Sequence, residues 1–114
     1  MKHKMRLCNA PFEGVKSGRK KIEMRLFDEK RSRLQKGDEI EFENVETKET
    51  LLCKVTGIYR YKSFEELYKN HDKISIGYAE SEVADPKDML AYYSKEEIER
   101  YGVVAIELAQ EMKK

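Results

Sequence analysis

The sequence predicts an α+β domain, a mixed and mostly antiparallel β-barrel decorated by short helices. The patterns run in the order strand, helix, three strands, three short helices and strand, and most connections have hairpin length, whereas parallel βαβ units need longer crossovers. The longest strand candidate, residues 51–61, is apolar on both faces and is interrupted by Gly57, which suits a bent strand of a small closed barrel. The 114 residues suffice for one core, so residues 1–114 are expected to form a single domain.

The first elements are a strand and a short helix. Residues 4–8 alternate between apolar and polar side chains, which is typical of a half-buried strand. Asn9 is a candidate N-cap residue for the helix, and Phe12 and Val15, three residues apart, form its apolar side. Gly18 follows the helix at the position where a left-handed backbone conformation is often needed.

The second strand is expected over residues 20–27. Because successive side chains of a strand point to opposite faces, Lys21, Glu23 and Arg25 should share one face. Lys20 stands where helix becomes strand. The opposite, apolar face can pack on a core, and it carries Ile22, Met24 and Leu26.

Two more strands come next along the chain. Residues 28–36 are almost wholly charged and are expected to form an exposed connection or one frayed helical turn. Residues 39–43 and 51–61 alternate as strands on either side of a polar reversal at 44–50. Gly57 indicates a bulge or bend in the second of them.

Three short helices and a last strand complete the chain. The helices are expected to begin after Ser63, Asp85 and Ser94, residue types that accept hydrogen bonds from the free N–H groups of a first turn. Residues 103–108 are rich in β-branched side chains and nearly free of charge, which favours a strand inside the sheet. The final lysines, 113 and 114, are expected to fray.

The composition indicates a folded protein with a strongly ionic surface. Apolar and charged residues each make up 39% of the chain, and no apolar run or signal pattern points to a membrane, so we expect a cytoplasmic protein. Cys8 and Cys53 stand far apart in apolar surroundings and are expected to be buried free thiols. His3 and His71 make no ligand-spaced set with them, so neither a metal nor another cofactor is predicted.

The charge is distributed unevenly along the chain. The net charge is +1, but residues 1–36 carry a balance of +8 and residues 37–114 a balance of −7. Such asymmetry favours a basic face suited to phosphate or another anion. Alternatively, the two parts interleave in the fold and neutralise each other.

One motif makes the chain resemble a known family. Its core is Gly18-x-Lys20-x-x-Glu23-x-Arg25, and ordered features lie on both sides of it. Together they resemble the ASCH family of the PUA-like superfamily over nearly the whole chain. The further matching features are Phe12 and Val15, Lys36-Gly37-Asp38-x-Ile40-x-Phe42, Ser63-Phe64-Glu65-Glu66-Leu67 and Tyr101-Gly102-Val103-Val104-Ala105-Ile106.

The resemblance implies a PUA-like β-barrel with a cleft between barrel and first helix, lined by the motif, and a role in RNA binding. It also implies an alternative, because some members resemble small amidohydrolases that remove the acyl group from an N4-acylated cytidine. In those members a lysine matches Lys20, but a threonine stands where this chain has Glu23. A carboxylate cannot serve as the hydroxyl nucleophile, so the sequence favours binding of RNA or of a nucleotide or nucleoside.

The motif residues suit different contacts with such a ligand. Lys20 is a compact charge for a phosphate, whereas the planar guanidinium of Arg25 fits bidentate contacts. Glu23 can orient Arg25, accept a hydrogen bond from an amino group such as cytosine N4, or act as a general base. The remaining candidate ligand contacts are Arg19, Lys16 and, as a stacking platform, Tyr61 with Tyr59 and Tyr68.

Structural roles remain open for several of these residues. Glu23 and Arg25 can form an ion pair that only fixes strand register, and tyrosines often fill barrel rims without binding anything. If the chain is an enzyme, Lys20 and Glu23 are its candidate catalytic residues. A third possibility is a protein-interaction domain whose sheet edge pairs with a partner strand.

Overall fold

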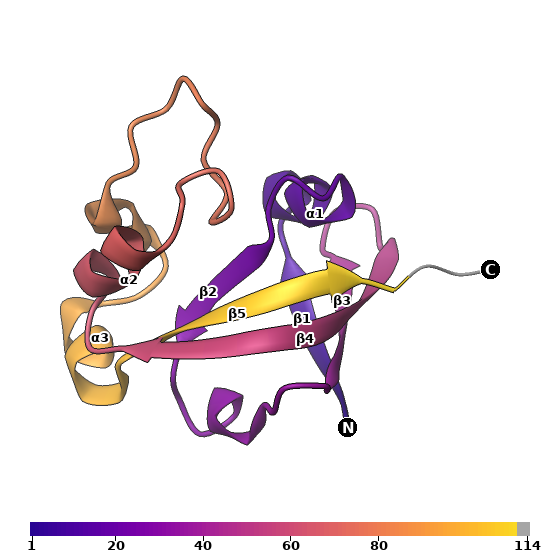
Figure 1. Cartoon of the computed structure of the whole chain (residues 1–114), viewed down its shortest axis with the longest axis horizontal. Coiled ribbons are helices and arrows are strands. Elements are labelled where there is room, and N and C mark those ends of the chain that lie inside the picture. The colour runs from indigo at the N-terminus through magenta and orange to yellow at the C-terminus, as the bar shows by residue number, and fades with distance from the viewer. Residues whose placement is uncertain (112–114) are drawn as a thin grey trace.

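The computed structural model describes residues 1–111, in which five strands form one sheet that is covered by short helices (Figure 1). The expected fraying of residues 113 and 114 lies outside the described residues. The elements in chain order are β1 (Lys2–Leu7), α1 (Asn9–Lys16), β2 (Ile22–Leu26), the 3₁₀ helix η1 (Arg31–Arg33), β3 (Glu39–Asn44), β4 (Thr50–Tyr61), α2 (Phe64–Asn70), the 3₁₀ helix η2 (Pro86–Ala91), α3 (Lys95–Tyr101) and β5 (Val103–Gln110).

The sheet has the strand order β1-β3-β4-β5-β2. The β1–β3 pair is parallel and the other three pairs are antiparallel, so the predicted α+β class with a mostly antiparallel sheet is confirmed. The sheet curls into a half-barrel, and within residues 1–111 its edge strands β1 and β2 do not pair with each other. Strand β5 lies between β4 and β2, as its apolar sequence predicts.

Helix α1 covers one face of the curled sheet, which we call the α1 face. Phe12 and Val15 are buried there against Val104 and Ile106 of β5. These contacts confirm the apolar side predicted for the helix. Gly18 follows the helix with a φ of 82°, the left-handed conformation that the sequence predicts for it.

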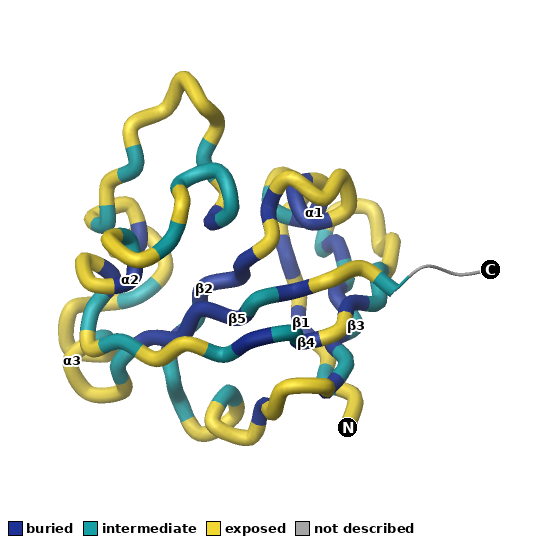
Figure 2. The backbone as a smooth tube through the Cα atoms, viewed as in Figure 1, coloured by how far each residue is buried: buried dark blue, intermediate teal, exposed yellow. Residues whose placement is uncertain are grey.

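The opposite face, which we call the α2 face, packs against α2, η2 and the segment 72–78 (Figure 2). Phe64 and Leu67 of α2 are buried on it. The caps predicted for the three later helices are present, since Ser63, Asp85 and Ser94 each accept a hydrogen bond from a backbone N–H two or three residues ahead. Strand β2 contributes the three apolar side chains predicted to share a face, Ile22, Met24 and Leu26.

Three local expectations are wrong. Cys8 is exposed, because β1 ends at Leu7 and Cys8 occupies the N-cap position of α1; Cys53 is buried, and burial raises the pKa of its thiol to about 11. Asn9 lies inside the helix, where its Oδ1 accepts a hydrogen bond from Asn44 Nδ2 at 2.9 Å. The second strand is Ile22–Leu26 rather than 20–27, because the chain before it bonds to another segment.

No helix within residues 1–111 is long and apolar enough to cross a lipid bilayer. In the same residues, no three His, Cys, Asp or Glu side chains converge as metal ligands would.

Asp38 connects the start of β3 to β1. Its Oδ2 atom lies 2.9 Å from His3 Nε2 and accepts the Gln35 backbone N–H at 3.0 Å. The hydrogen bond with His3 is the largest cause that lowers the pKa of Asp38, burial opposes it, and the net pKa is about 2 instead of 3.8. The carboxylate is therefore more stable in the folded chain than in the unfolded one.

We expect Asp38→Asn to lower the free energy of unfolding at neutral pH by about 1.5 to 3 kcal/mol, the range for a hydrogen bond to a charged group. A carboxyl group with a lowered pKa stabilises the fold above its ordinary pKa of 3.8, and this contribution disappears as the pH falls toward 2. Urea unfolding of both proteins should therefore show a large difference at neutral pH and a small one near pH 2. An equal difference at both values would contradict this account.

Candidate functional site

Lys20 is buried, with 6% of its surface exposed. Its aliphatic stem passes between two glycines: a Cβ atom at Gly14 of α1 would lie 3.2 Å from Lys20 Cβ, and one at Gly77 would lie 3.4 Å from Lys20 Cδ. A side chain at Gly14 would therefore crowd the lysine, whereas Gly77 touches it closely and has a φ of 117°, a conformation that favours glycine. The space between the two glycines, which we call the channel, lets the lysine side chain place its ammonium group below the surface.

The Lys20 ammonium group is surrounded by three acceptors. Its Nζ donates to the carbonyl oxygens of Ile22 at 2.6 Å and Ile76 at 3.3 Å, and lies 3.2 Å from Glu23 Oε1. A lysine has three N–H donors, so these contacts account for all of them. In this arrangement Lys20 joins strand β2 to the segment around Ile76 and has no donor left for a ligand.

Glu23 and Arg25 project from β2 onto the α1 face. Glu23 pairs across the sheet with Ile106 and Arg25 with Val104, and directly opposed residues of antiparallel strands share a face. Glu23 Oε2 lies 2.7 Å from Arg25 Nε. Both motif residues therefore lie on the same face, as the alternation predicts.

Arg25 also bridges the open side of the half-barrel. Its Nη2 donates to the backbone carbonyl of Arg6 in β1 at 3.0 Å. Strand β1 therefore receives a side-chain hydrogen bond from β2 in place of a backbone ladder. Contacts therefore run without a break from Lys20 through Glu23 and Arg25 to β1. We call these three charged side chains the buried triad, in which Lys20 and Glu23 are buried and Arg25 is partly buried.

The buried triad keeps Glu23 ionised. Burial by itself would raise the pKa of this carboxyl, but the charges of Lys20 and Arg25 and their hydrogen bonds outweigh it and hold the pKa below its ordinary value. An ionised acid with a lowered pKa is a weak general base. The triad is therefore better suited to fixing structure than to proton transfer.

The segment that supplies the Ile76 carbonyl is anchored from both sides. The backbone N–H groups of Lys21 and Ile22 donate to the Ser75 carbonyl at 2.9 and 3.0 Å. Lys73 Nζ donates to the carbonyls of Glu80 and Glu82 at 2.7 and 2.6 Å. The segment thus reaches Lys20 as a structured loop.

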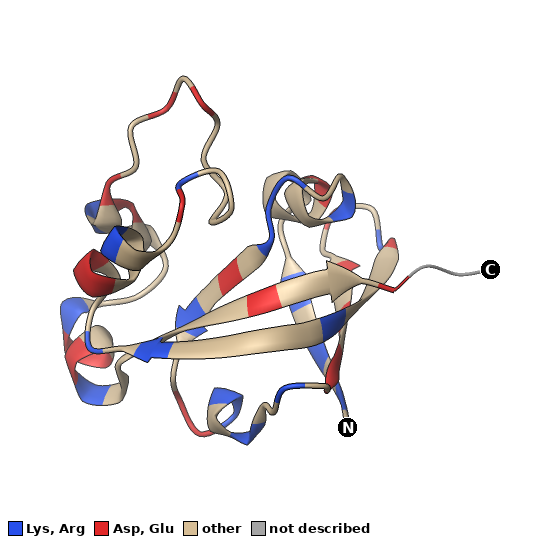
Figure 3. Cartoon of the chain, viewed as in Figure 1, with Lys and Arg blue, Asp and Glu red and all other residues tan. Residues whose placement is uncertain are grey.

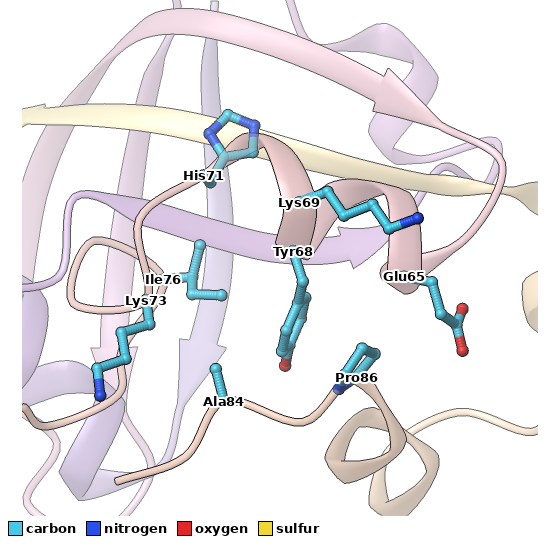
Figure 4. A pocket seen from close by; sticks show the side chains of 8 residues that line it. All are labelled: Glu65, Tyr68, Lys69, His71, Lys73, Ile76, Ala84 and Pro86. Carbon is cyan, nitrogen blue, oxygen red and sulfur yellow. The ribbon is translucent and has the colours of Figure 1, made fainter. Parts of the chain in front are cut away.

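Behind this loop lies a hollow of about 270 Å³ between α2 and residues 84–86 (Figure 4). Several of its polar groups are already engaged within the protein: the Tyr68 hydroxyl with that of Tyr78 at 2.9 Å, and His71 Nε2 with the Tyr61 hydroxyl at 2.9 Å. Its lining consists of Glu65, Tyr68, Lys69, His71, Lys73, Ile76, Ala84 and Pro86.

A larger groove of about 400 Å³ lies between the end of α1 and strands β4 and β5. Gln110 Nε2 donates to the Val15 carbonyl at 2.9 Å and also to the Lys16 carbonyl, which fastens the end of α1 to the end of β5. The groove lies beside the first helix, where the resemblance implies a cleft, but of the four motif residues only Gly18 and Lys20 line it. It is lined by Val15, Gly18, Lys20, Lys21, Cys53, Thr56, Glu107, Leu108, Ala109 and Gln110.

The cations around this groove differ in how they are paired. Lys16 is exposed and forms an ion pair with Glu49 at 2.7 Å. Arg19 and Lys21 are exposed and form no ion pair within residues 1–111. Arg19 lies beside α1, since its Nη2 would be 3.9 Å from a Cβ atom at Gly14.

Elsewhere, the two oppositely charged parts of the chain interleave (Figure 3). Strand β3 lies beside β1, where Glu41 pairs with Lys2 at 3.7 Å and Glu43 with Arg6 at 3.6 Å. Neutralisation therefore accounts for part of the N-terminal charge excess. The cations at the end of α1 are the part that remains beside a groove.

Tyr61 lies away from the buried triad. It pairs with Val103, whose side chain belongs to the α2 face, whereas Glu23 and Arg25 belong to the α1 face. Its hydroxyl contacts His71, so Tyr61 fills the rim between β4 and α2. Of the six site candidates, the structure brings Lys20, Glu23 and Arg25 together and places Arg19 and Lys16 near the groove.

Sequence reasoning overlooks the residues that create the channel and the groove floor. The position of Gly14 could have indicated the channel. A glycine inside a helix lowers helix stability by about 1 kcal/mol relative to alanine, so its presence suggests close packing at that position. Thr56 and Glu107 lie on different strands, far apart in the chain, and only the β4–β5 register brings them together. No local pattern marks the Ile76 carbonyl.

The fold and the site define an α+β half-barrel with a buried triad beside an open groove. The chain belongs to the ASCH domain family, whose model matches residues 5–112. No curated protein matches it.

Two solved structures share the fold over their whole length. The crystal structure of the hypothetical protein PH0355 is 36% identical, with a TM-score of 0.83 and 97% of this chain covered. The solution NMR structure of protein PF0455 from Pyrococcus furiosus is 32% identical, with a TM-score of 0.71 and 99% of this chain covered. Each alignment covers 100% of the other chain.

Replacing Lys20 tests the role of the buried triad in stability. We expect Lys20→Met to lower the free energy of unfolding by about 3 to 5 kcal/mol, because it removes one partner of a buried, ionised carboxylate. The exposed neighbour offers a matched control, and Lys21→Met should change stability by no more than about 0.5 kcal/mol. Chemical denaturation measures both.

The combination of Lys20→Met with Glu23→Gln separates charge from packing. Removing the carboxylate charge as well should recover part of the loss, because the buried group that has lost Lys20 is then neutral. The proposed role of the triad is wrong if Lys20→Met is no more harmful than Lys21→Met, or if the double variant is simply the sum of the two single changes.

Proposed function

We propose that this protein binds single-stranded RNA in the groove between α1 and strands β4 and β5. The observation that carries the proposal is that two exposed cations flank buried Lys20 in the chain without an ion-pair partner in the described residues. Lys21 lines the groove, and Arg19 directly follows Gly18, which also lines it. RNA binding has been proposed for the ASCH domain family, which supports the same conclusion. As part of the proposal, we place the protein in the cytoplasm.

The dimensions and charge of the groove support this kind of ligand. Its volume of about 400 Å³ falls in the range of sites that enclose a small molecule, which suits one nucleotide rather than a duplex. Single-stranded RNA offers unstacked bases to such a site, and its phosphates follow surface cations. In the proposal, Arg19 and Lys21 contact phosphates and Lys16 adds to the basic rim.

The buried triad has a positioning role in this proposal. Lys20, Glu23 and Arg25 carry a combined charge of +1 and fix the start of β2, from which Lys21 projects. Lys20 itself lines the groove, so its charge lies below the bound phosphate. Glu23 and Arg25 lie outside the groove lining and act through the strand that they hold.

The geometry favours binding over the amidohydrolase activity that the resemblance also implies. The donors of Lys20 are engaged by protein acceptors, and Glu23 is held ionised by two cations. Neither residue is arranged to activate a nucleophile toward an acyl group. To engage the Lys20 ammonium group, a substrate would have to displace one of its protein acceptors.

Removing the two exposed cations tests the proposal. We expect Arg19→Ala combined with Lys21→Ala to weaken binding to a mixed-sequence single-stranded RNA, measured by fluorescence anisotropy at several salt concentrations. Each lost phosphate contact reduces the slope of log K against log salt by about 0.7, so the slope should fall by about 1.4. All sequences should be affected about equally, because phosphate contacts carry no sequence information.

Helix α3 offers a matched control, since Lys95→Ala with Arg100→Ala removes the same two charges far from α1 (Figure 1). This control should leave the affinity and the salt slope close to those of the unmodified protein. Equal losses in both double variants would reduce the interaction to general charge attraction, and no binding at low salt would refute RNA binding.

A further inference from the structure

We infer that Glu107, Thr56 and Tyr59 form a base-recognition subsite beside the groove, which prefers bases carrying an exocyclic amino group over uracil. The inference rests on the proposed RNA binding and adds to it the part of the nucleotide that is recognised. It follows from the bulge in β4, where the pairing register with β5 shifts between Val55 and Gly57.

The bulge places a hydroxyl group against the Glu107 carboxylate. Thr56 is the extra residue of the bulge, and its Oγ1 donates to Glu107 Oε1 at 3.1 Å. Bulges often redirect a side chain in this way next to a functional site. The hydrogen bond orients the carboxylate, and both residues line the groove.

Gly57 leaves room for an aromatic ring next to this carboxylate. A Cβ atom at Gly57 would lie 2.8 Å from Glu107 Oε1 and 2.8 Å from the Tyr59 hydroxyl oxygen, so both side chains converge over a bare backbone. Any larger residue at this position would push them apart. An acceptor and an aromatic ring are thereby brought within reach of one base.

Tyr59 presents this ring to solvent. It is 41% exposed, although most large apolar and aromatic side chains of the fold are covered. The His71 ring packs beside it, with ring centroids 5.4 Å apart and the ring planes tilted by 56°. Base–aromatic stacking contributes about 1 to 3 kcal/mol per base and does not depend on sequence, so Tyr59 supplies affinity and Glu107 supplies selectivity.

The selectivity follows from the chemistry of the carboxylate, which only accepts hydrogen bonds. Cytosine presents an N4 amino group to such an acceptor, whereas uracil presents a carbonyl oxygen at the equivalent position. An oriented carboxylate therefore attracts the first and repels the second. Cytosine and uracil have nearly the same shape, which makes them matched probes of this one contact.

The test compares cytidine and uridine oligonucleotides of equal length, with fluorescence anisotropy at low salt. The unmodified protein should bind the cytidine oligonucleotide about tenfold more tightly, which corresponds to about 1.4 kcal/mol for one such contact. Glu107→Gln should abolish this ratio, because a carboxamide can also donate to the uracil carbonyl. Tyr59→Ala should weaken both oligonucleotides and keep the ratio.

Two further variants serve as a control for the loss of any carboxylate and as a second test of the Glu107 contact. Glu99→Gln removes one exposed carboxylate from α3 and should preserve the tenfold ratio. Thr56→Val keeps the shape but removes the hydroxyl, and it should reduce the ratio even if Glu107→Gln folds poorly.

Equal binding of the two oligonucleotides by the unmodified protein, or a ratio that survives Glu107→Gln, would overturn the subsite and leave RNA binding intact. Failure to bind either oligonucleotide at low salt would refute the proposed function itself, and the subsite with it.

Discussion

A buried ammonium group joins four parts of this chain. Lys20 passes between α1 and the segment 72–78, bonds to carbonyls of β2 and of that segment, and pairs with Glu23, which in turn holds Arg25 against β1. Charges in a protein interior are stable only when they are paired and hydrogen-bonded. Every element that contributes an acceptor is therefore fixed relative to the others, and the two edge strands of the half-barrel are bridged without a backbone ladder.

Because of this constraint, the charged motif residues fix the structure, whereas the neighbouring cations are free to contact a ligand. The three charged residues that make the motif recognisable are occupied with each other, whereas Arg19 and Lys21 beside them project into solvent. In the proposed function, the fixed start of β2 thus presents exposed cations beside the groove, as scaffolds commonly do with binding residues. Glu41 and Glu43 of β3 pair with Lys2 and Arg6 of β1, so that part of the N-terminal charge excess is neutralised away from the groove.

Periodic patterns predicted most of the fold. Alternation predicted the strands and the apolar face of Ile22, Met24 and Leu26, and capping residues predicted the helix starts. The buried state of Lys20 was not predictable, because it depends on Gly14 and on a loop more than fifty residues away. The exposure of Cys8 depends on where β1 stops, and the position of Tyr61 on the pairing of β4 with β5. Such non-local geometry leaves no periodic signal.

The most direct measurement is a ¹⁵N-edited NMR spectrum of the lysine ammonium groups, without RNA and with single-stranded RNA added. Buried, hydrogen-bonded ammonium protons exchange slowly with water, so Lys20 should give a sharp signal at neutral pH while exposed lysines such as Lys21 exchange rapidly. Added RNA should slow exchange at Lys21 and leave the Lys20 signal in place. A Lys20 ammonium group that exchanges as fast as the exposed lysines would contradict the account, because the buried triad would then not be formed in solution.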